Sequence, residues 1–336
     1  MATSKANDPL GRRCQAPVFG VLRLRAELLA RIRAFFATRG VLEVETPMLS
    51  AAATTDPHLA SFATVYSGPG PRYGQPLYLH TSPEFPMKRL LAAGSGCIYQ
   101  IARVLRDGEA GHRHNPEFTL LEWYRVGFDH HRLMNEVADL VTELLANRLP
   151  LTEPEWLSYW ELFERHLGLD PHQATVVELA AVAERQGVSI PPRMPVQEVD
   201  PWLDLLLTHC LEPYLGQGRL CFVYDYPASQ AALARLRPGN PLVGERFELY
   251  LNGIELANGF HELGDAVEQR RRFAAENATR QMRGLPVMPL DENLLAALES
   301  GLPDCAGVAL GFDRLVMLAA GKETLAEVLA FPFEQA

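Results

Sequence analysis

The sequence predicts an α+β fold in which helices flank an antiparallel sheet. Two pairs of strand-like segments are joined by loops that suit β-hairpins: residues 99–105 with 117–124, and 246–251 with 254–260. Segments with helical spacing of apolar residues lie between and after these pairs. Because strands and helices do not alternate regularly, a βαβ series with a parallel sheet is not favoured.

The N-terminal part is expected to begin with a helix. Leu24, Leu28 and Ile32 recur at helical spacing, and Gly40 is a suitable stop for that helix. Residues 41–45 then alternate as a strand, which the following proline ends. The next expected elements are a strand at 77–82 and a short helix at 83–94.

A long polar loop, RDGEAGHRHNP, separates the first pair of strand-like segments. Long loops of this kind cost little to close and are usually functional. Residues 130–220, which follow the pair, show a mostly helical pattern and no recognisable chemistry. We interpret them as a helical elaboration of the domain.

The C-terminal part opens with the second hairpin, where Asn252-Gly253 suits a type I′ turn between apolar strands. Asp265, with Glu268 three residues later, resembles a capping box at the start of a helix. The remaining expected elements are a helix at 291–300, a strand at 307–312 and a buried helix at 313–321.

Length and composition bound the class of protein. The 336 residues are 48% hydrophobic and 21% charged, which is typical of a globular protein. A net charge of −10 argues against a chain-wide surface for nucleic acid or anionic membrane. The chain has no apolar run of membrane-spanning length, no signal peptide and no C-x-x-C pair among its five cysteines. We expect a cytoplasmic protein with a leader at 1–21 and a single domain at 22–336.

Common catalytic motifs are absent from the sequence. It contains no G-x-x-x-x-G-K-[ST] phosphate loop, no G-x-G-x-x-G after a strand and no G-x-S-x-G elbow. His261-Glu262 begins like a zinc-protease H-E-x-x-H motif, but position 265 is aspartate. These absences exclude the usual nucleotide-binding and hydrolase signatures.

Three segments nevertheless carry residues suited to a nucleotide. Arg106 and Asn115 in the polar loop could grip a phosphate and an adenine edge, and Phe118 offers a ring for stacking. A solvated turn is the simpler interpretation of this loop alone. Gly311 permits close backbone approach by a ligand. Arg314 could face a terminal phosphate or pair structurally with the preceding aspartate.

Glu255 and Glu262 lie in an otherwise apolar strand. Seven residues apart, they would occupy opposite faces of a regular strand. We expect a bulge at Asn258-Gly259 to bring them to one side. Buried carboxylates need partners, which magnesium bridging polyphosphate oxygens or an arginine would supply.

Together these segments resemble the catalytic core of class II aminoacyl-tRNA synthetases, especially the lysyl enzyme. GVLEVETPML is similar to motif 1, which that class associates with the dimer interface. RVLRDGEAGHRHNPEFTLLEWY resembles motif 2 and GVALGFDRL resembles motif 3. TSPE at 81–84 and RFELYLNGIELANGFHEL match the lysyl-type core. The resemblance extends from about residue 22 to the C-terminus and implies a homodimer.

About twenty residues precede the first core helix, too few for the anticodon-binding OB domain of a lysyl-tRNA synthetase. The resemblance therefore points to a stand-alone family, the elongation factor P–(R)-β-lysine ligases. These enzymes activate β-lysine as an adenylate and transfer it to a lysine side chain of elongation factor P. The resemblance implies ATP and magnesium as cofactors, (R)-β-lysine or lysine as substrate and elongation factor P as acceptor, without anticodon recognition.

The resemblance also implies roles for individual residues. Arg106 and Arg314 are implied to be catalytic, with Arg106 on the α-phosphate. Glu255 and Glu262 are implied to hold magnesium. The residues implied to bind ATP are Arg106, Glu109, Asn115, Phe118, Glu255, Leu256, Asn258, Gly311 and Arg314. Those implied to bind the amino acid are Ser82, Glu84, Tyr124, Glu262 and Ala309.

Two positions bear on this reading. Ala309 stands where lysyl-tRNA synthetases have glycine and the ligase family has alanine; one extra methyl group in a close-packed pocket could favour a β-amino over an α-amino group by about 1–3 kcal/mol. Motif 2 normally reads Arg-x-Glu, but here Gly108 occupies the acidic position and Glu109 follows it. We expect either Glu109 or the backbone to take that role.

Three alternatives are kept open. An amino-acid ligase with a small amine as acceptor could use the same core. A non-catalytic regulatory paralogue would be expected to lose motif arginines and metal carboxylates, yet Arg106, Arg314, Glu255 and Glu262 all stand. A tRNA-charging enzyme is disfavoured by the net acidity of the chain.

Overall fold

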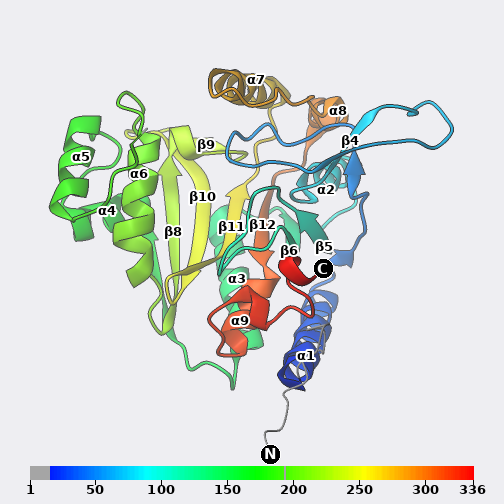
Figure 1. Ribbon diagram of the computed structural model, residues 1–336, viewed down its shortest axis with the longest axis horizontal. Coiled ribbons are helices and arrows are strands. Elements are labelled where there is room, and N and C mark those ends of the chain that lie inside the picture. The colour runs from blue at the N-terminus through cyan, green and yellow to red at the C-terminus, as the bar shows by residue number, and fades with distance from the viewer. Residues whose placement is uncertain (1–15, 193) are drawn as a thin grey trace, which may run out of the picture.

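Residues 16–192 and 194–336 are described by a computed structural model, in which a nine-stranded mixed sheet lies between two sets of helices (Figure 1). Its order is β1-β5-β6-β12-β11-β10-β8-β7, with β9 beside β10. The strands are β1 (Leu42–Glu43), β5 (Ile98–Leu105), β6 (Glu117–Val126), β7 (Thr152–Ser158), β8 (Arg219–Pro227), β9 (Leu236–Arg237), β10 (Val243–Leu251), β11 (Ile254–His261) and β12 (Cys305–Gly311).

A small second sheet, in the order β2-β4-β3, lies beside the first. Its strands are β2 (Leu49–Ser50), β3 (Ala63–Val65) and β4 (Pro76–Leu79). The α-helices are α1 (Ala16–Thr38), α2 (Glu84–Ala92), α3 (His130–Leu145), α4 (Tyr159–Leu167), α5 (Val176–Arg185), α6 (Asp200–Leu206), α7 (Ala266–Met282), α8 (Glu292–Gly301) and α9 (Phe312–Ala319). Short 3-10 or π turns occupy Leu207–Leu211, Glu212–Tyr214, Ala228–Gln230, Leu325–Glu327 and Phe333–Gln335.

The predicted α+β class is confirmed, and most strand pairs are antiparallel as expected. The exceptions are β1 with β5 and β7 with β8, which pair in parallel at the two ends of the sheet. Strand β7 was not predicted, because its sequence, TEPEWLS, shows no clean alternation of apolar residues. Only Leu157 of this strand is buried, so its sequence carries no alternating apolar face.

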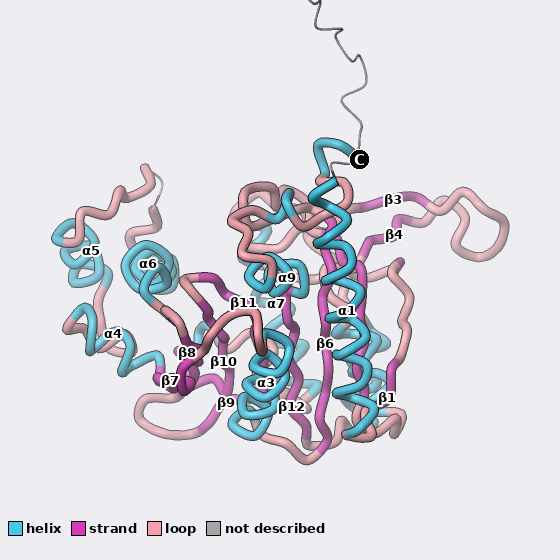
Figure 2. Tube along the Cα trace, turned by 90° about the horizontal axis from the view of Figure 1, so that it is seen from below, coloured by secondary structure: helices cyan, strands magenta, loops and turns pink. Residues whose placement is uncertain are grey.

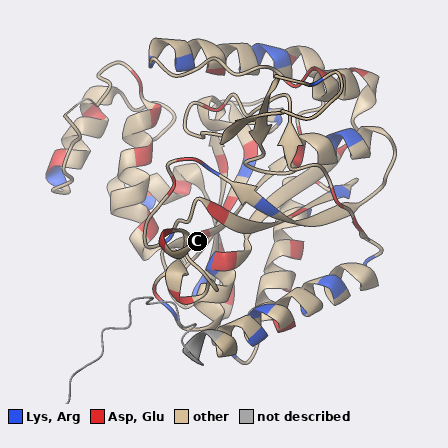
Figure 3. Cartoon of the chain, turned by 45° about the vertical axis from the view of Figure 1, so that its right-hand side comes forward, with Lys and Arg blue, Asp and Glu red and all other residues tan. Residues whose placement is uncertain are grey.

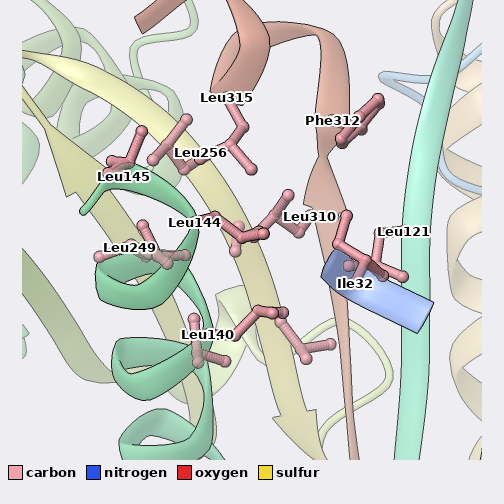
Figure 4. Packing of buried hydrophobic residues seen from close by; sticks show 14 of the residues in the cluster. Ile32, Leu121, Leu140, Leu144, Leu145, Leu249, Leu256, Leu310, Phe312 and Leu315 are labelled. Atoms are coloured by element: carbon pink, nitrogen blue, oxygen red, sulfur yellow. The ribbon is translucent and has the colours of Figure 1, made fainter. Parts of the chain in front are cut away.

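Helices α1, α3 and α9 cover one face of the large sheet (Figure 2). Leucines of α3, including Leu140 and Leu144, interdigitate with Leu249, Leu256 and Leu310 of the strands (Figure 4). The prediction that 130–220 is a helical elaboration is therefore wrong for α3, which belongs to the principal core. Its apolar residues recur at helical spacing and are buried against the sheet rather than against the later helices.

Helices α4, α5 and α6 form a second core at the β8 end of the sheet (Figure 1). Leu162, Phe163, Leu179 and Leu206 are fully buried there, together with Val223 of β8. The elaboration thus begins after α3, and it is attached to the sheet through its own apolar cluster.

Helix α1 begins at Ala16, earlier than the predicted start of the domain at residue 22. Val21, Leu24 and Leu28 are buried at helical spacing, so the apolar face extends to the N-terminal side of the expected boundary. Residues 16–21 of the predicted leader are helical. Residues 1–15 of that leader lie outside the described residues.

The second hairpin forms as predicted. Asn252 and Gly253 have φ values of 51° and 69°, the left-handed conformations that a type I′ turn requires. Strands β10 and β11 pair through this turn.

A bulge in β11 was expected at Asn258-Gly259 and instead lies at Leu256. Leu249 pairs with Ala257, but the next residue, Tyr250, pairs with Glu255, so Leu256 is the extra residue. Leu256 and Ala257 are both buried in the principal core, which explains the position of the irregularity. The predicted consequence still holds, because one inserted residue brings positions seven apart to the same face.

Helix α7 is capped at its N-terminus by an aspartate side chain. The Asp265 side chain caps α7 by accepting from the amides of Val267 and Glu268, but Glu268 pairs with Arg271 and Arg272 instead of completing a capping box. Basic and acidic residues are interspersed along α7 and elsewhere (Figure 3). None of the described helices is both long and apolar enough to cross a membrane.

Candidate active site

A cavity of about 1060 Å³ opens beside β6, β11 and β12. A much smaller hollow adjoins it and shares Glu84, Asn258, Phe260 and Ala309 with it. Every site residue predicted from the sequence lines one or both of these spaces. The larger cavity takes Ser82, Glu84, Arg106, Glu109, Asn115, Phe118, Glu255, Leu256, Asn258, Ala309, Gly311 and Arg314, and the smaller hollow adds Tyr124 and Glu262.

Arg106 directly follows β5, where the loop of the first hairpin begins. Its guanidinium carbon is 5.1 Å from the centroid of the Phe118 ring, across the strand pair. Its Nη1 atom is 3.7 Å from Glu109 Oε1, while Gly108 between them turns the chain with a φ of +81°. Glu109 therefore occupies a position from which it can orient Arg106, although glycine holds the usual acidic position.

Asn115 is engaged within the protein. Its amide nitrogen donates to the Glu117 carbonyl at 2.6 Å, and its amide oxygen accepts from the Phe333 amide at 3.1 Å. These bonds fix the returning strand of the hairpin and attach the C-terminal segment to it. A contact between Asn115 and a nucleotide stays a prediction.

Arg314 lies on the first turn of α9, and its side chain reaches β11. It donates to the Glu255 carbonyl at 2.8 Å and lies 3.3 Å from Glu255 Oε2. It also donates to His114 Nε2 at 2.9 Å. Burial lowers the pKa of His114, and Arg314 lowers it further, so the neutral ring can accept this bond.

The alternative in which Arg314 pairs with Asp313 is not what the fold adopts. Asp313 is buried and pairs instead with Arg25 of α1, and it accepts from the Thr119 amide at 2.9 Å. This contact ties α1, β6 and α9 together. It leaves the Arg314 guanidinium free to line the cavity.

Three carboxylates and one ammonium group meet at the inner end of the site. Lys88 Nζ lies 2.6 Å from Glu84 Oε1 and 2.6 Å from Glu262 Oε2. Glu122 accepts from the Ser82 hydroxyl at 2.6 Å and from the Tyr124 hydroxyl at 2.8 Å. With one cation among three acids, the inner pocket has an excess of negative charge when all are ionised.

The pKa values of these acids reflect that crowding. Burial, followed by the charge of Glu84, raises the pKa of Glu122 to about 8. Burial also raises the pKa of Glu262 to about 7, against the opposing effect of Lys88. A bound cation would relieve both, because opposite charge favours the ionised carboxylate. The inner pocket is therefore suited to an ammonium group.

Lys88, Glu122 and Glu248 were missed by sequence reasoning. Glu248 is buried in β10, where it accepts from Tyr226, Tyr250 and Asn258 and pairs with Arg246. Both glutamates could have been found from the sequence, because each is a charged residue within an apolar strand segment; Glu122, for example, lies between Leu121 and Trp123. Lys88, one of only three lysines in an arginine-rich chain, gave a weaker signal.

The two predicted metal carboxylates have different surroundings. Burial, and then the neighbouring Glu248, raises the pKa of Glu255, which lines the main cavity. Oxygen donors in that position fit magnesium. Glu262 is 2% exposed and lines only the smaller hollow, not the main cavity. Its carboxylate is thus better suited to the inner pocket than to a metal.

Two small residues of β12 determine the shape of the inner pocket. A Cβ atom at Gly307 would overlap with the Tyr124 ring and with the Glu262 carboxylate. Ala309 lines both spaces, so its methyl group stands where they meet. A side chain is excluded at the first position and only a methyl group is present at the second.

Comparison with known proteins agrees with this geometry. Residues 14–335 match the tRNA synthetases class II (D, K and N). The chain is 54% identical over 312 residues to an elongation factor P–(R)-β-lysine ligase of Vibrio vulnificus (strain YJ016), covering 93% of this chain and 95% of that protein. It is 52% identical over 321 residues to the ligase of the same name from Klebsiella pneumoniae (strain 342), covering 96% and 97%. The chain therefore belongs to the class II tRNA synthetase family, together with these elongation factor P–(R)-β-lysine ligases.

Proposed function

We propose that this protein activates (R)-β-lysine with ATP and transfers it to a lysine side chain of elongation factor P. The observation that carries the proposal is the acidic pocket of Glu84, Glu122 and Glu262 at the inner end of a cavity lined by Arg106 and Arg314. Such a pocket suits a substrate with two ammonium groups. Both relatives named above carry this activity in their names.

In the first step the substrate carboxylate attacks the α-phosphorus of ATP, forming the acyl adenylate and releasing pyrophosphate. Arg106 would contact the α-phosphate, where negative charge accumulates in the transition state. Phe118 and Arg314 would hold the adenine between a ring and a guanidinium group. Positioning and charge stabilisation account for the rate, and no general base is needed.

We propose Glu255 as the principal magnesium ligand, with Glu262 reserved for the substrate ammonium group. Magnesium, when bound, neutralises phosphate charge so that an anionic carboxylate can approach. Glu248 would support Glu255 from the neighbouring strand. Arg314, 3.3 Å from Glu255 Oε2, would share the phosphate side of the cavity with it.

In the second step the ε-amine of an acceptor lysine attacks the adenylate carbonyl, so that an amide bond forms and AMP leaves. The attacking amine must first lose a proton.

A homodimer is also proposed, on the resemblance of residues 40–49 to motif 1. Leu42, Met48 and Leu49 there are 57%, 39% and 46% exposed, as expected of apolar residues that a second copy would cover. Light scattering of the purified protein tests this.

The decisive experiment incubates the protein with ATP, elongation factor P and either (R)-β-lysine or α-lysine. Pyrophosphate exchange reports the first step, and the mass of elongation factor P reports the second. We expect exchange and a mass increase of one β-lysyl group. Exchange without acylation of the factor, but with acylation of small amines, would favour a small-molecule ligase. Absence of exchange with every lysine isomer would favour a non-catalytic paralogue.

A further inference from the structure

A buried imidazole lies on the face of the large sheet opposite the inner pocket. His130 is the first residue of α3 and is 1% exposed. Neither of its ring nitrogens has a hydrogen-bond partner among the described residues. Asp225 Oδ1 is 3.6 Å from Nε2, beyond hydrogen-bond distance. Buried polar groups are nearly always satisfied, so the two unpartnered nitrogens of this ring need an explanation.

Two further donor groups face the same point. Glu245 of β10 and His261 of β11 each place one ligand atom so that these atoms and a nitrogen of His130 all lie within 4.8 Å of one another. His261 Nδ1 and Glu245 Oε2 are 2.6 Å apart. Two imidazoles and a carboxylate form a donor set typical of zinc, which takes His nitrogens at about 2.0–2.1 Å. None of the three residues lines the cavity of the proposed active site.

A second layer of carboxylates orients the two rings. Asp304 Oδ1 is 3.0 Å from His261 Nε2, so it can accept the proton there and leave the Nδ1 lone pair facing Glu245. Asp225 Oδ1 also lacks a hydrogen-bond partner within the described part of the chain and could accept from His130. Arg237 holds the other oxygen of Asp225. Carboxylates behind histidine ligands are a regular feature of metal centres.

A cluster without metal satisfies only part of this arrangement. A protonated His261 could donate to both Glu245 and Asp304, and that pair of bonds needs no ion. Even if Asp225 moves in from 3.6 Å to accept from Nε2, such a cluster leaves the other nitrogen of His130 without a partner in a buried position. A cation accepting a lone pair from each ring satisfies all three groups.

We propose that His130, Glu245 and His261 bind one zinc ion, with water completing tetrahedral coordination. The ion would join the start of α3 to β10 and β11. His261 directly precedes Glu262, and successive residues of a strand point to opposite faces. The zinc would therefore fix, from behind, the strand that carries Glu262 into the inner pocket. It would act as a structural ion, away from the reacting groups.

The test titrates zinc into the metal-stripped full-length protein, in competition with a chromophoric chelator. Excess magnesium is included to occupy sites made only of oxygen ligands. We expect one tightly bound zinc per chain. His130→Asn and Glu245→Gln are each expected to lower the affinity at least about tenfold. The matched control is His166→Asn, because His166 is an exposed histidine outside the cluster. It should bind as the wild type does.

Equal affinity in His130→Asn and wild type would overturn the proposal, as would failure of the wild type to bind zinc. Should the variants not fold, X-ray absorption of the zinc-loaded wild type decides the question without them. Two imidazoles with oxygen ligands in the first shell are expected. A shell of oxygen alone would contradict the assignment.

Discussion

The Nζ atom of Lys88 lies 2.6 Å from the Oε2 atom of Glu262, and both side chains are 2% exposed. This pair joins α2 to the end of β11 at the base of the inner pocket. Burial alone would lower the pKa of Lys88, but Glu262 and Glu84 raise it above its ordinary value, so the ammonium group stays charged. A permanent cation therefore lies next to two acids of the pocket, although Lys88 itself lines neither space.

We predict that Lys88→Met destabilises the fold by about 3–5 kcal/mol, because it leaves two carboxylates without their buried counter-ion. Urea unfolding of the variant measures this. Lys322→Met is the control: Lys322 pairs with Glu327 at 3.2 Å, and both are exposed, so its loss should cost less than about 1 kcal/mol. Equal effects of the two substitutions would contradict a structural role for the buried pair.

Arg106→Ala should reduce pyrophosphate exchange by about 10²–10³, since it removes a charge positioned for the α-phosphate. The free energy of unfolding should change little, because Arg106 is partly exposed and its contacts are weak: a 3.7 Å ion pair with Glu109, a 3.4 Å hydrogen bond to the Thr81 carbonyl and the face of the Phe118 ring. Arg103→Ala offers a control on the same hairpin, where Arg103 pairs with exposed Glu117. If both variants lost exchange to the same extent, damage to the hairpin rather than lost catalysis would be the explanation.

Ala309→Gly should shift selectivity toward α-lysine. Removing a methyl group where the two spaces meet gives room for an α-amino group, and one such group is worth about 10- to 200-fold in discrimination. The ratio of kcat/KM in pyrophosphate exchange for the two isomers measures it. Ala306→Gly places the same flexible residue in β12, but at a site buried in the principal core. That control should lose stability and leave the ratio unchanged.

The pH dependence of stability should reveal the raised pKa of Glu122. Its pKa is raised to about 8 in the folded protein from an ordinary value of 4.5, so the folded state binds more protons between these values. Stability must then fall as pH rises from about 4.5 toward 8. Glu122→Gln cannot ionise and should show a shallower decline over that range. Urea midpoints at pH 5, 6, 7 and 8 compare the two proteins, and parallel curves would refute the assignment.

The same carboxylate should affect substrate binding. An ammonium group binds the ionised form of Glu122, so the KM for the amino acid should decrease as pH rises toward 8. In Glu122→Gln the KM should be higher and less dependent on pH. Exchange assays at saturating ATP give both profiles. The KM for ATP, measured at saturating amino acid, is an internal control that Glu122 should not affect.

Local patterns were sufficient to predict much of this structure. Asn252-Gly253 specifies its turn through two left-handed residues, and Asp265 caps α7, so neither depends on distant contacts. The pairing of Lys88 with Glu262 joins residues 174 positions apart in sequence (262 − 88), and no local pattern reports it. The bulge at Leu256 was misplaced for a similar reason, because packing against α3 fixes it. The family resemblance identified residues around both spaces but not their partners inside the fold.

Because Leu256 is an inserted residue, the alternation of side chains between the two faces of β11 changes phase at that point. On its N-terminal side, the face with Ile254 meets the core and Glu255 meets the cavity; beyond Ala257, the even-numbered Asn258 and Glu262 face the ligand side. Deleting that one leucine would restore a regular strand and exchange the faces of everything on one side of it. The orientation of the residues proposed to bind the substrate therefore depends on the number of residues in β11 as much as on their identity.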